Sequence, residues 1–387
     1  MNTNVAEKKN QHTVPQFYFR RFSRDGRTID LFNIRRRKAI LNASISGQCS
    51  KAYFYGKDGK KEVAFEKLEG VASRIIAAIL ETNKLPDKHS KEHLELLFYI
   101  LSQHNRTKHT GEEYNEEINK LWKILLKDVS DLSSVLEHGK IVCTDPTAEQ
   151  LYALGTTWVF GLDLSIKIVT NRSTEAFIFS DHPVVYYNQY MENFTAASCT
   201  GLASRGLQVF FPISPRTLLH LYDPGVYRVG ASTSEYCEIW QGAEALKINE
   251  LQWLNALENL YYSRETTPES IESQAKRFLP RRPAGLAVVE EYRPMYPTPG
   301  IDRSLIAMRK VDLKTRLRPS FVRIRKSKKK IPLFEREQVR SPHLMAAWDE
   351  FDKQVEGGNY RPEDFLKFLA RKQPSERLAQ DFCAQGT

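Results

Sequence analysis

Apolar side chains recur every three or four residues over four stretches in the first half of the chain. In the first of them Phe65, Leu68 and Ile75 fall on one face, which is the spacing of an amphipathic helix. Ser90 stands directly before the second stretch, where its side chain suits the N-cap position. The first half is therefore expected to be mostly helical. The expected helices are residues 62–82, 90–106, 112–127 and 147–162.

Shorter runs of alternating or β-branched apolar residues predict strands. Four of the six lie between residues 165 and 222, before a return to a helical pattern at residues 248–262. The third and fourth strands below are expected to pair with each other, as are the fifth and sixth. The expected strands are residues 28–34, 52–55, 165–170, 176–180, 206–212 and 217–222.

The pattern as a whole predicts an α+β fold. We expect a helical N-terminal half and a mixed or antiparallel sheet, followed by a basic segment and a small helical tail. Residues 1–285 would form the α+β core, residues 286–340 a Pro/Arg-rich and then strongly basic segment, and residues 341–387 the tail. The tail helices are expected at residues 343–356 and 362–370.

The net charge of +10 is concentrated in one segment. Residues 309–340 hold thirteen Lys and Arg against three Asp and Glu, so they account for the whole excess of positive charge. Such a stretch is typical of a surface that binds DNA or RNA, and the alternative is a solvated tail that only aids solubility. The side chains expected to contact nucleic acid are Arg316, Arg318, Arg323, Arg325, Lys326, Lys328, Lys329 and Lys330.

The sequence gives no sign of a membrane or of export. No stretch approaches the ~20 apolar residues that a membrane helix needs, and residues 1–12 are polar, without the apolar core of a secretory signal. The five Cys are scattered along the chain, which fits a reducing compartment. A cytoplasmic location and no membrane partner are expected.

Several common catalytic signatures are missing. The sequence contains no GxxxxGK followed by Ser or Thr, no GxGxxG after a strand, no HExxH, no GxSxG and no Cys-rich zinc pattern. The absence of these motifs argues against four classes of enzyme: P-loop hydrolases, Rossmann dehydrogenases, zinc proteases and α/β-hydrolases. An active site must be sought among scattered polar residues.

Two candidate sites of this kind stand beside an aromatic run or a strand. His12 opens the run QHTVPQFYFRRF, and its imidazole could act as acid, base or metal ligand, although a lone His is more often structural. Asp181 and His182 follow an apolar strand, where polar groups could hold a metal or orient a water. The alternative for Asp181 is a turn in which its carboxylate accepts backbone N–H groups.

Two further sets lie on predicted helices. Glu62, Glu66 and Glu69 share one face of the first helix, where they could hold a cation or simply be solvated. Gln103 and Arg106 lie three residues apart at the end of the second helix. Arg106 there could grip a phosphate with its guanidinium, or merely complement the helix dipole.

Taken in chain order, the runs QHTVPQFYFRRF, SQHNRT, FSDHPVVYYN, FFPISPRTLLHLY and INELQWLNALENLYYS resemble domain-of-unknown-function family 4238. That family opens with a His-x-Val-Pro run, has a Ser-Asp-x-Pro step after a strand and carries an Asn-x-x-Gln helix near its end. The resemblance spans residues 10–280 and implies an architecture but no reaction. His182, at the variable place of Ser-Asp-x-Pro, gains no support from it. The residues that it favours are His12, Glu69, Gln103, Arg106, Ser180, Asp181 and Asn249.

The residues and the resemblance lead to two hypotheses. The first is a nucleic-acid-directed enzyme, a phosphodiesterase or nuclease in bacterial defence or toxicity. Arg106, with Gln103 beside it, would offset charge on phosphate, His12 would act as base or metal ligand, and Glu69 and Asp181 would hold Mg²⁺ or Mn²⁺. The second is a non-catalytic nucleic-acid-binding or sensor module, in which the same polar residues form a buried network. Convergence in an open cleft would favour the enzyme, and satisfied burial the module.

Overall fold

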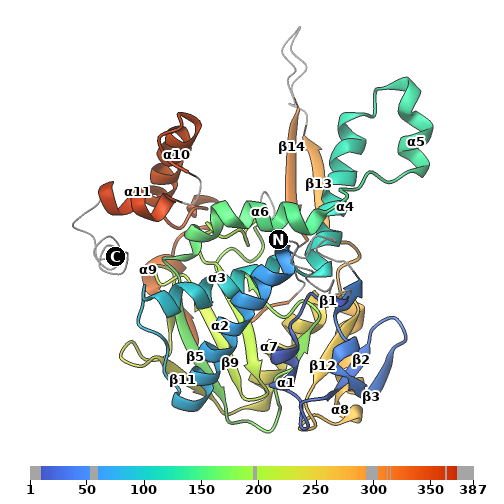
Figure 1. The fold of residues 1–387 in the computed structure, drawn as a ribbon, viewed down its shortest axis with the longest axis vertical. Helices are drawn as coiled ribbons and strands as arrows, with labels where there is room; N and C mark the ends of the chain where they lie inside the picture. Colours follow the sequence, from blue (N-terminus) through green and yellow to red (C-terminus); the bar gives the residue numbers. More distant parts are fainter. Residues whose placement is uncertain are drawn as a thin grey trace, which may run out of the picture.

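A five-stranded sheet lies at the centre of the fold, with the order β11-β5-β9-β8-β7 (Figure 1). The computed structural model describes residues 10–52, 60–194, 198–292, 304–311, 313, 315–361 and 364–372. β8 and β9 form the predicted antiparallel pair, whereas β11 joins β5 in parallel. The strands are β5 (Ser165–Asn171), β7 (Val185–Tyr187), β8 (Gln208–Ser214), β9 (Thr217–Tyr222) and β11 (Tyr236–Ile239).

A second sheet, β3-β2-β12-β6, joins segments that the sequence pattern did not bring together. β6 pairs with β12 and not with β5, so the predicted pairing of residues 165–170 with residues 176–180 is wrong. The predicted helix over residues 248–262 ends at Asn255, after which the chain enters β12. The strands are β2 (Thr28–Asn33), β3 (Lys38–Ser44), β6 (Phe179–Ser180) and β12 (Asn259–Tyr262).

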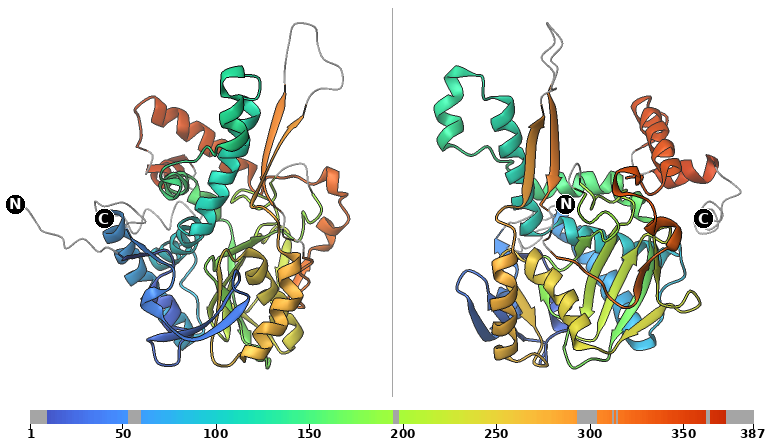
Figure 2. Two further views of the ribbon diagram at one scale, coloured as in Figure 1. Left: turned by 90° about the vertical axis from the view of Figure 1, so that its right-hand side faces the viewer. Right: turned by 180° about the vertical axis from the view of Figure 1, so that it is seen from behind.

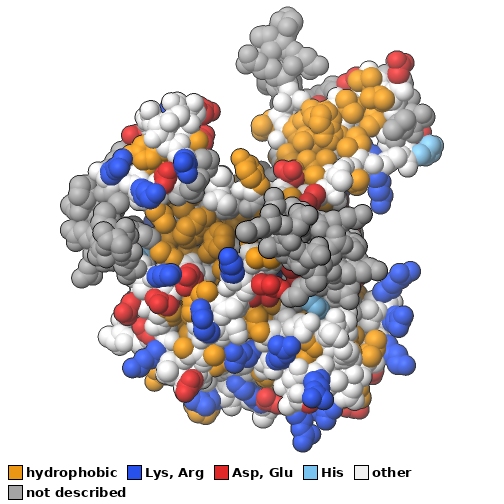
Figure 3. Space-filling model, in the orientation of Figure 1, with side chains coloured by type: hydrophobic (Ala, Val, Ile, Leu, Met, Phe, Trp, Pro, Cys, Tyr) orange, Lys and Arg blue, Asp and Glu red, His pale blue; other side chains and the backbone are white. Residues whose placement is uncertain are grey.

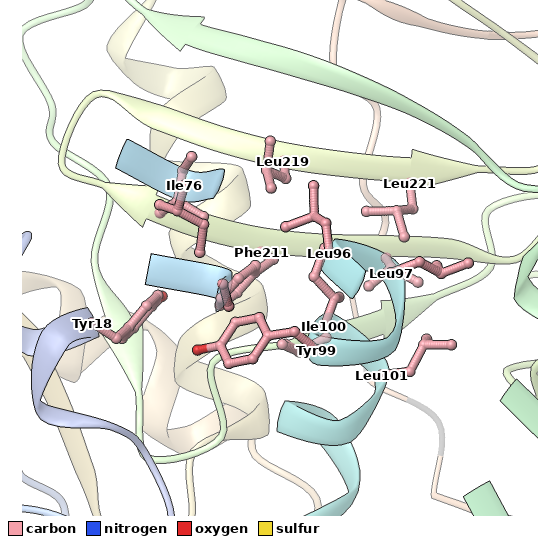
Figure 4. Close-up of a cluster of buried hydrophobic side chains, with 14 of the residues drawn as sticks. Tyr18, Ile76, Leu96, Leu97, Tyr99, Ile100, Leu101, Phe211, Leu219 and Leu221 are labelled. Atoms are coloured by element: carbon pink, nitrogen blue, oxygen red, sulfur yellow. The ribbon is translucent and has the colours of Figure 1, made fainter. Parts of the chain in front are cut away.

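Two long helices, α2 (Lys60–Thr82) and α3 (Lys91–Asn105), cover one face of the five-stranded sheet (Figures 1 and 4). α3 begins where the sequence predicts, because the Ser90 side chain accepts a hydrogen bond from the backbone N–H of His93 at 3.2 Å. Ile76 and Leu96 of these helices pack into one buried cluster with Phe211, Leu219 and Leu221 of β8 and β9. Burial of each such side chain stabilises the fold by roughly 1.5–3 kcal/mol.

The opposite face of the sheet is covered by α7 (Gly242–Asn255) and by part of the basic segment. Phe210 and Leu218 point to this face because side chains alternate along a strand, and they pack in one cluster with Leu251, Leu317 and Phe321. The chain then forms β15 (Val322–Ile324), which pairs with β10 (Tyr227–Val229). The segment that carries the charge excess is thus built into the core rather than hanging free as a solvated tail.

Helices occur along the whole described chain, so the expected helical N-terminal half is not confirmed, although the α+β class is. The first described residues form β1 (Asn10–His12), which pairs with β4 (Ser50–Ala52). Helices also occupy the second half and the tail, and no helix in the described ranges has both the length and the apolarity to cross a bilayer. These later helices are α8 (Pro268–Phe278), α9 (Lys326–Lys329), α10 (Pro342–Glu356) and α11 (Phe365–Lys372).

A helical arm and a hairpin project together from the body (Figures 1 and 2). The arm contains α4 (Lys108–Leu125) and α5 (Ser133–His138), and the hairpin is β13 (Ala287–Tyr292) with β14 (Leu305–Lys310). Apolar side chains, including the exposed Trp122 and Leu125, gather on the arm (Figure 3). The first turns of α4 and the base of the hairpin reach back to the body, where they border the site described next.

Candidate functional site

The largest group of histidines surrounds a cavity of about 610 Å³, here called the histidine pocket. Its defining side chains come from three regions far apart in the sequence: the end of α3 with the start of α4, the loop after β6 with strand β7, and the end of β14. Three of these side chains are imidazoles, and the others are a carboxylate, a phenol and an ammonium group. They are His104, His109, His182, Glu113, Tyr186 and Lys310.

Four aromatic rings of the pocket form two stacked pairs, His104 on Tyr186 and His109 on His182, and a tilted contact between His104 and His182 joins the pairs. The ring of His104 lies on Tyr186 with centroids 3.8 Å apart, and His182 lies 4.5 Å from His104 and 4.4 Å from His109. His104 Nδ1 lies 2.9 Å from the carbonyl oxygen of Val184, so this nitrogen carries the proton and donates it. His182 Nδ1 is 2.7 Å from the Thr107 hydroxyl. Two of the three imidazoles are therefore held in place by hydrogen bonds.

The third imidazole, His109, lies beside Glu113 and Lys310, and these three residues are here called the His109 trio. Glu113 lies one helical turn further along α4, and its carboxylate is 2.9 Å from Lys310 Nζ and 3.8 Å from His109 Nδ1. Lys310 Nζ is also 3.4 Å from His104 Nε2. His109 Nδ1 is buried and has no hydrogen-bond partner among the described residues. An imidazole oriented beside a carboxylate and an ammonium is an arrangement that general acid–base catalysis uses.

Burial keeps all three imidazoles neutral. It lowers the pKa of His104 and of His182 well below the usual range of histidine, and the charge of Lys310 acts in the same direction. Burial, assisted by the charges of Lys310 and Arg282, lowers the pKa of His109 to about 3. Neutral imidazoles can accept protons. A bound anion would offset the neighbouring cations and raise these pKa values again.

One wall of the histidine pocket is the beginning of the basic segment, through Lys310, Leu313, Thr315 and the exposed Arg316. Beyond the pocket, Arg318 pairs with Glu192, which also lines the pocket. The remaining predicted nucleic-acid contacts lie on β15 and α9 or directly beside them, and all are exposed except the half-buried Lys328. They are Arg323, Arg325, Lys326, Lys328, Lys329 and Lys330.

A second cavity of about 410 Å³, here called the acidic pocket, is lined by three glutamates of α2, Glu62, Glu66 and Glu69, together with His12 and Gln16. Gln16 Nε2 donates to His12 Nε2 at 3.0 Å, and His12 Nδ1 lies 3.2 Å from the carbonyl oxygen of Gln48. An imidazole that accepts at Nε2 must donate at Nδ1. Both ring nitrogens of His12 are thus engaged in the fold.

Four of the five predicted catalytic residues meet at this acidic pocket. Arg106 is buried behind it, donating from Nη1 to Glu69 at 2.7 Å and from Nε to Gln103 at 2.9 Å. Its guanidinium also lies 4.7 Å from the centre of the Phe65 ring. Gln103 in turn donates to the backbone oxygen of Thr13, next to His12. The network joins α2, α3 and the N-terminal segment.

Asp181, the fifth predicted residue, lines neither pocket. Its carboxylate accepts backbone hydrogen bonds from Leu257, Glu258 and Asn259 at 2.5–2.9 Å, and these bonds turn the chain from α7 into β12. Burial raises the pKa of Asp181 to about 6, while the three N–H groups act in the opposite direction and favour the charged carboxylate. The carboxylate thus accepts backbone N–H groups, as in the alternative that the sequence left open, but these groups lie more than seventy residues away and not in the turn around Asp181.

Ser180 and Asn249 also connect segments of the fold. The Ser180 hydroxyl donates to Gln252 Oε1 at 2.9 Å, and Asn249 bonds to the backbone of Ala176 and Ile178. Both bridges tie the segment of β6 to α7. Within the described ranges no group of three or more His, Cys, Asp or Glu has a geometry that could hold a metal ion. The Mg²⁺ or Mn²⁺ ion expected at Glu69 and Asp181 stays a prediction.

Sequence reasoning did not identify His104, His109, Glu113 or Lys310 as site residues. His104 stands within the run SQHNRT and His109 only five residues later, so both lay close to the predicted Arg106. Nothing in their spacing indicates that His182 and Lys310, far along the chain, would join them. A density of histidine around residue 106 was the only available signal.

Comparison with known proteins gives one match. A family model described as "Protein of unknown function (DUF4238)" matches residues 10–266. That range contains the three histidines and Glu113 but ends before Lys310. No curated protein and no solved structure matches the chain.

Proposed function

The chain belongs to the DUF4238 family, and from this premise we propose that its histidine pocket is the active site of a phosphodiesterase that acts on nucleic acid. The observation that carries the proposal is the path of the basic segment. Lys310, Leu313, Thr315 and Arg316, near its start, form a wall of the pocket. Its exposed cations continue along β15 and α9. A strand held by those cations would be led to the imidazoles.

Each residue of the His109 trio has a role in the proposed reaction. His109 takes the proton of the attacking hydroxyl, which belongs to water or to the 2′ position of RNA. Glu113, 3.8 Å from His109 Nδ1, stabilises the charged form that the ring takes on with this proton. Lys310 offsets the negative charge that develops on the phosphate oxygens. As the new P–O bond forms, the bond to the leaving 5′-oxygen breaks, and the proton passes from His109 to that oxygen.

The test compares a single-stranded RNA with its 2′-deoxy counterpart, each with EDTA or with added Mg²⁺ or Mn²⁺. Cleavage of either strand supports the proposal, and protein carrying His109→Ala, purified in parallel, controls for contaminating nucleases. Cleavage of RNA alone, unaffected by EDTA, indicates attack by the 2′-hydroxyl without a metal. Cleavage that requires Mg²⁺ or Mn²⁺ indicates a metal-assisted route. Intact strands under every condition would reject the proposal.

A second candidate is the non-catalytic nucleic-acid-binding or sensor module. The observation in its favour is the acidic pocket, where hydrogen bonds link the predicted catalytic residues Arg106, Glu69 and Gln103 in a network that joins three segments. This module would bind single strands through the basic segment and leave them uncut. The same assay separates the two candidates, because only the enzyme changes the length of the strand.

A further inference from the structure

The far end of the histidine pocket holds a second charged group, built around Glu250 of α7. The Glu250 side chain is fully buried, with 0% exposure. Lys247 contacts it at 3.0 Å and Arg281 at 2.5 Å. Both cations also line the pocket and keep more than a third of their side-chain surface exposed. One carboxylate thus orients two cations whose side chains still reach the pocket.

A buried carboxylate is costly unless it is paired, so Glu250 fixes where Lys247 and Arg281 sit. Fixed cations that still reach an open cavity are suited to bind an anion, and the guanidinium of arginine matches phosphate oxygens with two parallel hydrogen bonds. Among the described residues that line the pocket, basic side chains outnumber carboxylates. Its basic side chains are Lys247, Arg281, Lys310 and Arg316, against the carboxylates Glu113 and Glu192.

The position of this group relative to the imidazoles follows from the geometry of α7. Asn255, at the end of the helix, donates from Nδ2 to the backbone oxygen of His182 at 3.3 Å. Lys247 lies eight residues earlier on the same helix, which corresponds to about 12 Å along the axis. Apolar side chains, Leu254 and Met191 among them, line the pocket as well. A cavity of about 610 Å³ is of the size that small ligands fill.

We propose that Lys247 and Arg281 bind the terminal phosphate of a nucleic-acid strand, so that the pocket takes strand ends that carry a phosphomonoester. This inference rests on the proposed function, since it places the scissile phosphodiester at His109 and Lys310. The apolar part of the lining would hold the sugar and base between the two phosphates. A strand end fits a pocket of this volume better than the middle of a long polymer does.

The experiment measures binding, so that it does not depend on cleavage. Three trinucleotides of one sequence carry a 5′-phosphate, a 3′-phosphate or no terminal phosphate, and their Kd values for the full chain with His109→Ala are measured by calorimetry at constant ionic strength. At least one phosphorylated form should bind about tenfold tighter than the unphosphorylated form, a difference of about 1.4 kcal/mol. Adding Arg281→Gln or Lys247→Gln should remove this preference.

Lys276→Gln is the matched control, because Lys276 is exposed on α8 and does not line the pocket. It should keep the preference unchanged. Equal affinity for all three trinucleotides, or a preference that survives both Arg281→Gln and Lys247→Gln, would overturn the inference. If the preference is found but wild-type protein cleaves no strand, the phosphate subsite stands and the phosphodiesterase proposal falls. If strands are cleaved without the preference, the phosphodiesterase proposal stands and the phosphate subsite falls.

Discussion

The acidic pocket and the histidine pocket both contain imidazoles and carboxylates, but the hydrogen bonding of these groups differs between the two. In the acidic pocket both ring nitrogens of His12 are hydrogen-bonded, and Glu69 is held by the buried Arg106. In the histidine pocket Nδ1 of His109 is buried without a hydrogen-bond partner among the described residues. Polar groups that satisfy one another stabilise a fold, whereas an oriented but unsatisfied group beside a cavity is available to a ligand. We therefore assign structure to the first pocket and chemistry to the second.

Removing one imidazole from each pocket gives the strongest test of this assignment. His109→Ala should lower the rate of strand cleavage by about 10²–10⁴-fold, since that is the usual contribution of an acid–base group. His12→Ala should lower the rate, per folded molecule, by less than about tenfold, well below that usual contribution. Rates are measured at saturating substrate, with circular dichroism to count folded protein. A larger loss for His12→Ala than for His109→Ala would reverse the assignment.

The stabilising role of the acidic pocket predicts the next effect. Glu69→Ala leaves the charge of Arg106, whose side chain is only 1% exposed, without its carboxylate partner. Because the Glu69 side chain is itself 24% exposed, loss of the pair should lower the free energy of unfolding by about 1–3 kcal/mol. Urea unfolding measures the change, and Glu66→Ala on the same helix face is the control. Equal stability of the two variants would show that Glu69 does not hold the network together.

The neutral imidazoles predict how stability depends on pH. Because the pKa of His109 falls to about 3 on folding, the unfolded chain binds a proton below about pH 6.5 that the folded chain does not. Stability should thus fall as the pH decreases from about 6.5 toward 3, by about 1.4 kcal/mol per pH unit for this residue. His109→Gln should flatten the decline between about pH 6 and pH 4 by that amount. Urea unfolding at several pH values measures both slopes, and identical slopes would contradict the predicted burial.

The smallest expected effect concerns the path of the strand outside the pocket. The combined change Lys326→Gln, Lys329→Gln and Lys330→Gln removes exposed cations at α9. The slope of log K against log salt should become shallower by about 0.7 for each phosphate that no longer meets a cation. Arg35→Gln, Arg36→Gln and Lys38→Gln remove the same charge from exposed sites between and on β2 and β3, and should leave the slope unchanged. Equal slopes for both variants would remove α9 from the path.

Point substitutions test the role of the basic segment in binding nucleic acid better than a truncation after Ala307, which removes that segment and everything after it. Removing the segment would delete Leu317 and Phe321 from the core. It would also delete Arg340, whose buried guanidinium pairs with Asp163 and donates to the backbone oxygens of Leu202 and Ser204. Binding that disappears after truncation could then reflect a failure to fold.

Local sequence signals predicted the elements that depend on local physics. α3 has its apolar period and its Ser90 cap, and β8 and β9 are adjacent strands that pair across a short turn. The helix predicted through residue 262 failed because the hydrogen bonds that end it come from Asp181, more than seventy residues away. No local pattern contains such a contact.

The same limit explains why the acidic pocket was found from the sequence and the histidine pocket was not. Glu62, Glu66 and Glu69 share a helix face that their spacing reveals, and Gln103 and Arg106 lie one turn apart. His104 and Lys310 are 206 residues apart, and only the packing of the β13–β14 hairpin against α4 brings them together. Glu116 helps to fix that packing by accepting a hydrogen bond from the backbone N–H of Leu286 at 3.0 Å.

The most direct test of the assignment observes both pockets at once. In protein with isotope-labelled histidine rings, the side-chain NMR signals of His109 and His12 are identified by His109→Gln and His12→Gln, and a 5′-phosphorylated trinucleotide is added. We predict that the His109 signal moves toward that of a protonated ring, because a bound phosphate raises its pKa, while the His12 signal stays in place. A shift of His12 with an unchanged His109 signal would contradict the claim that the histidine pocket is where the substrate binds.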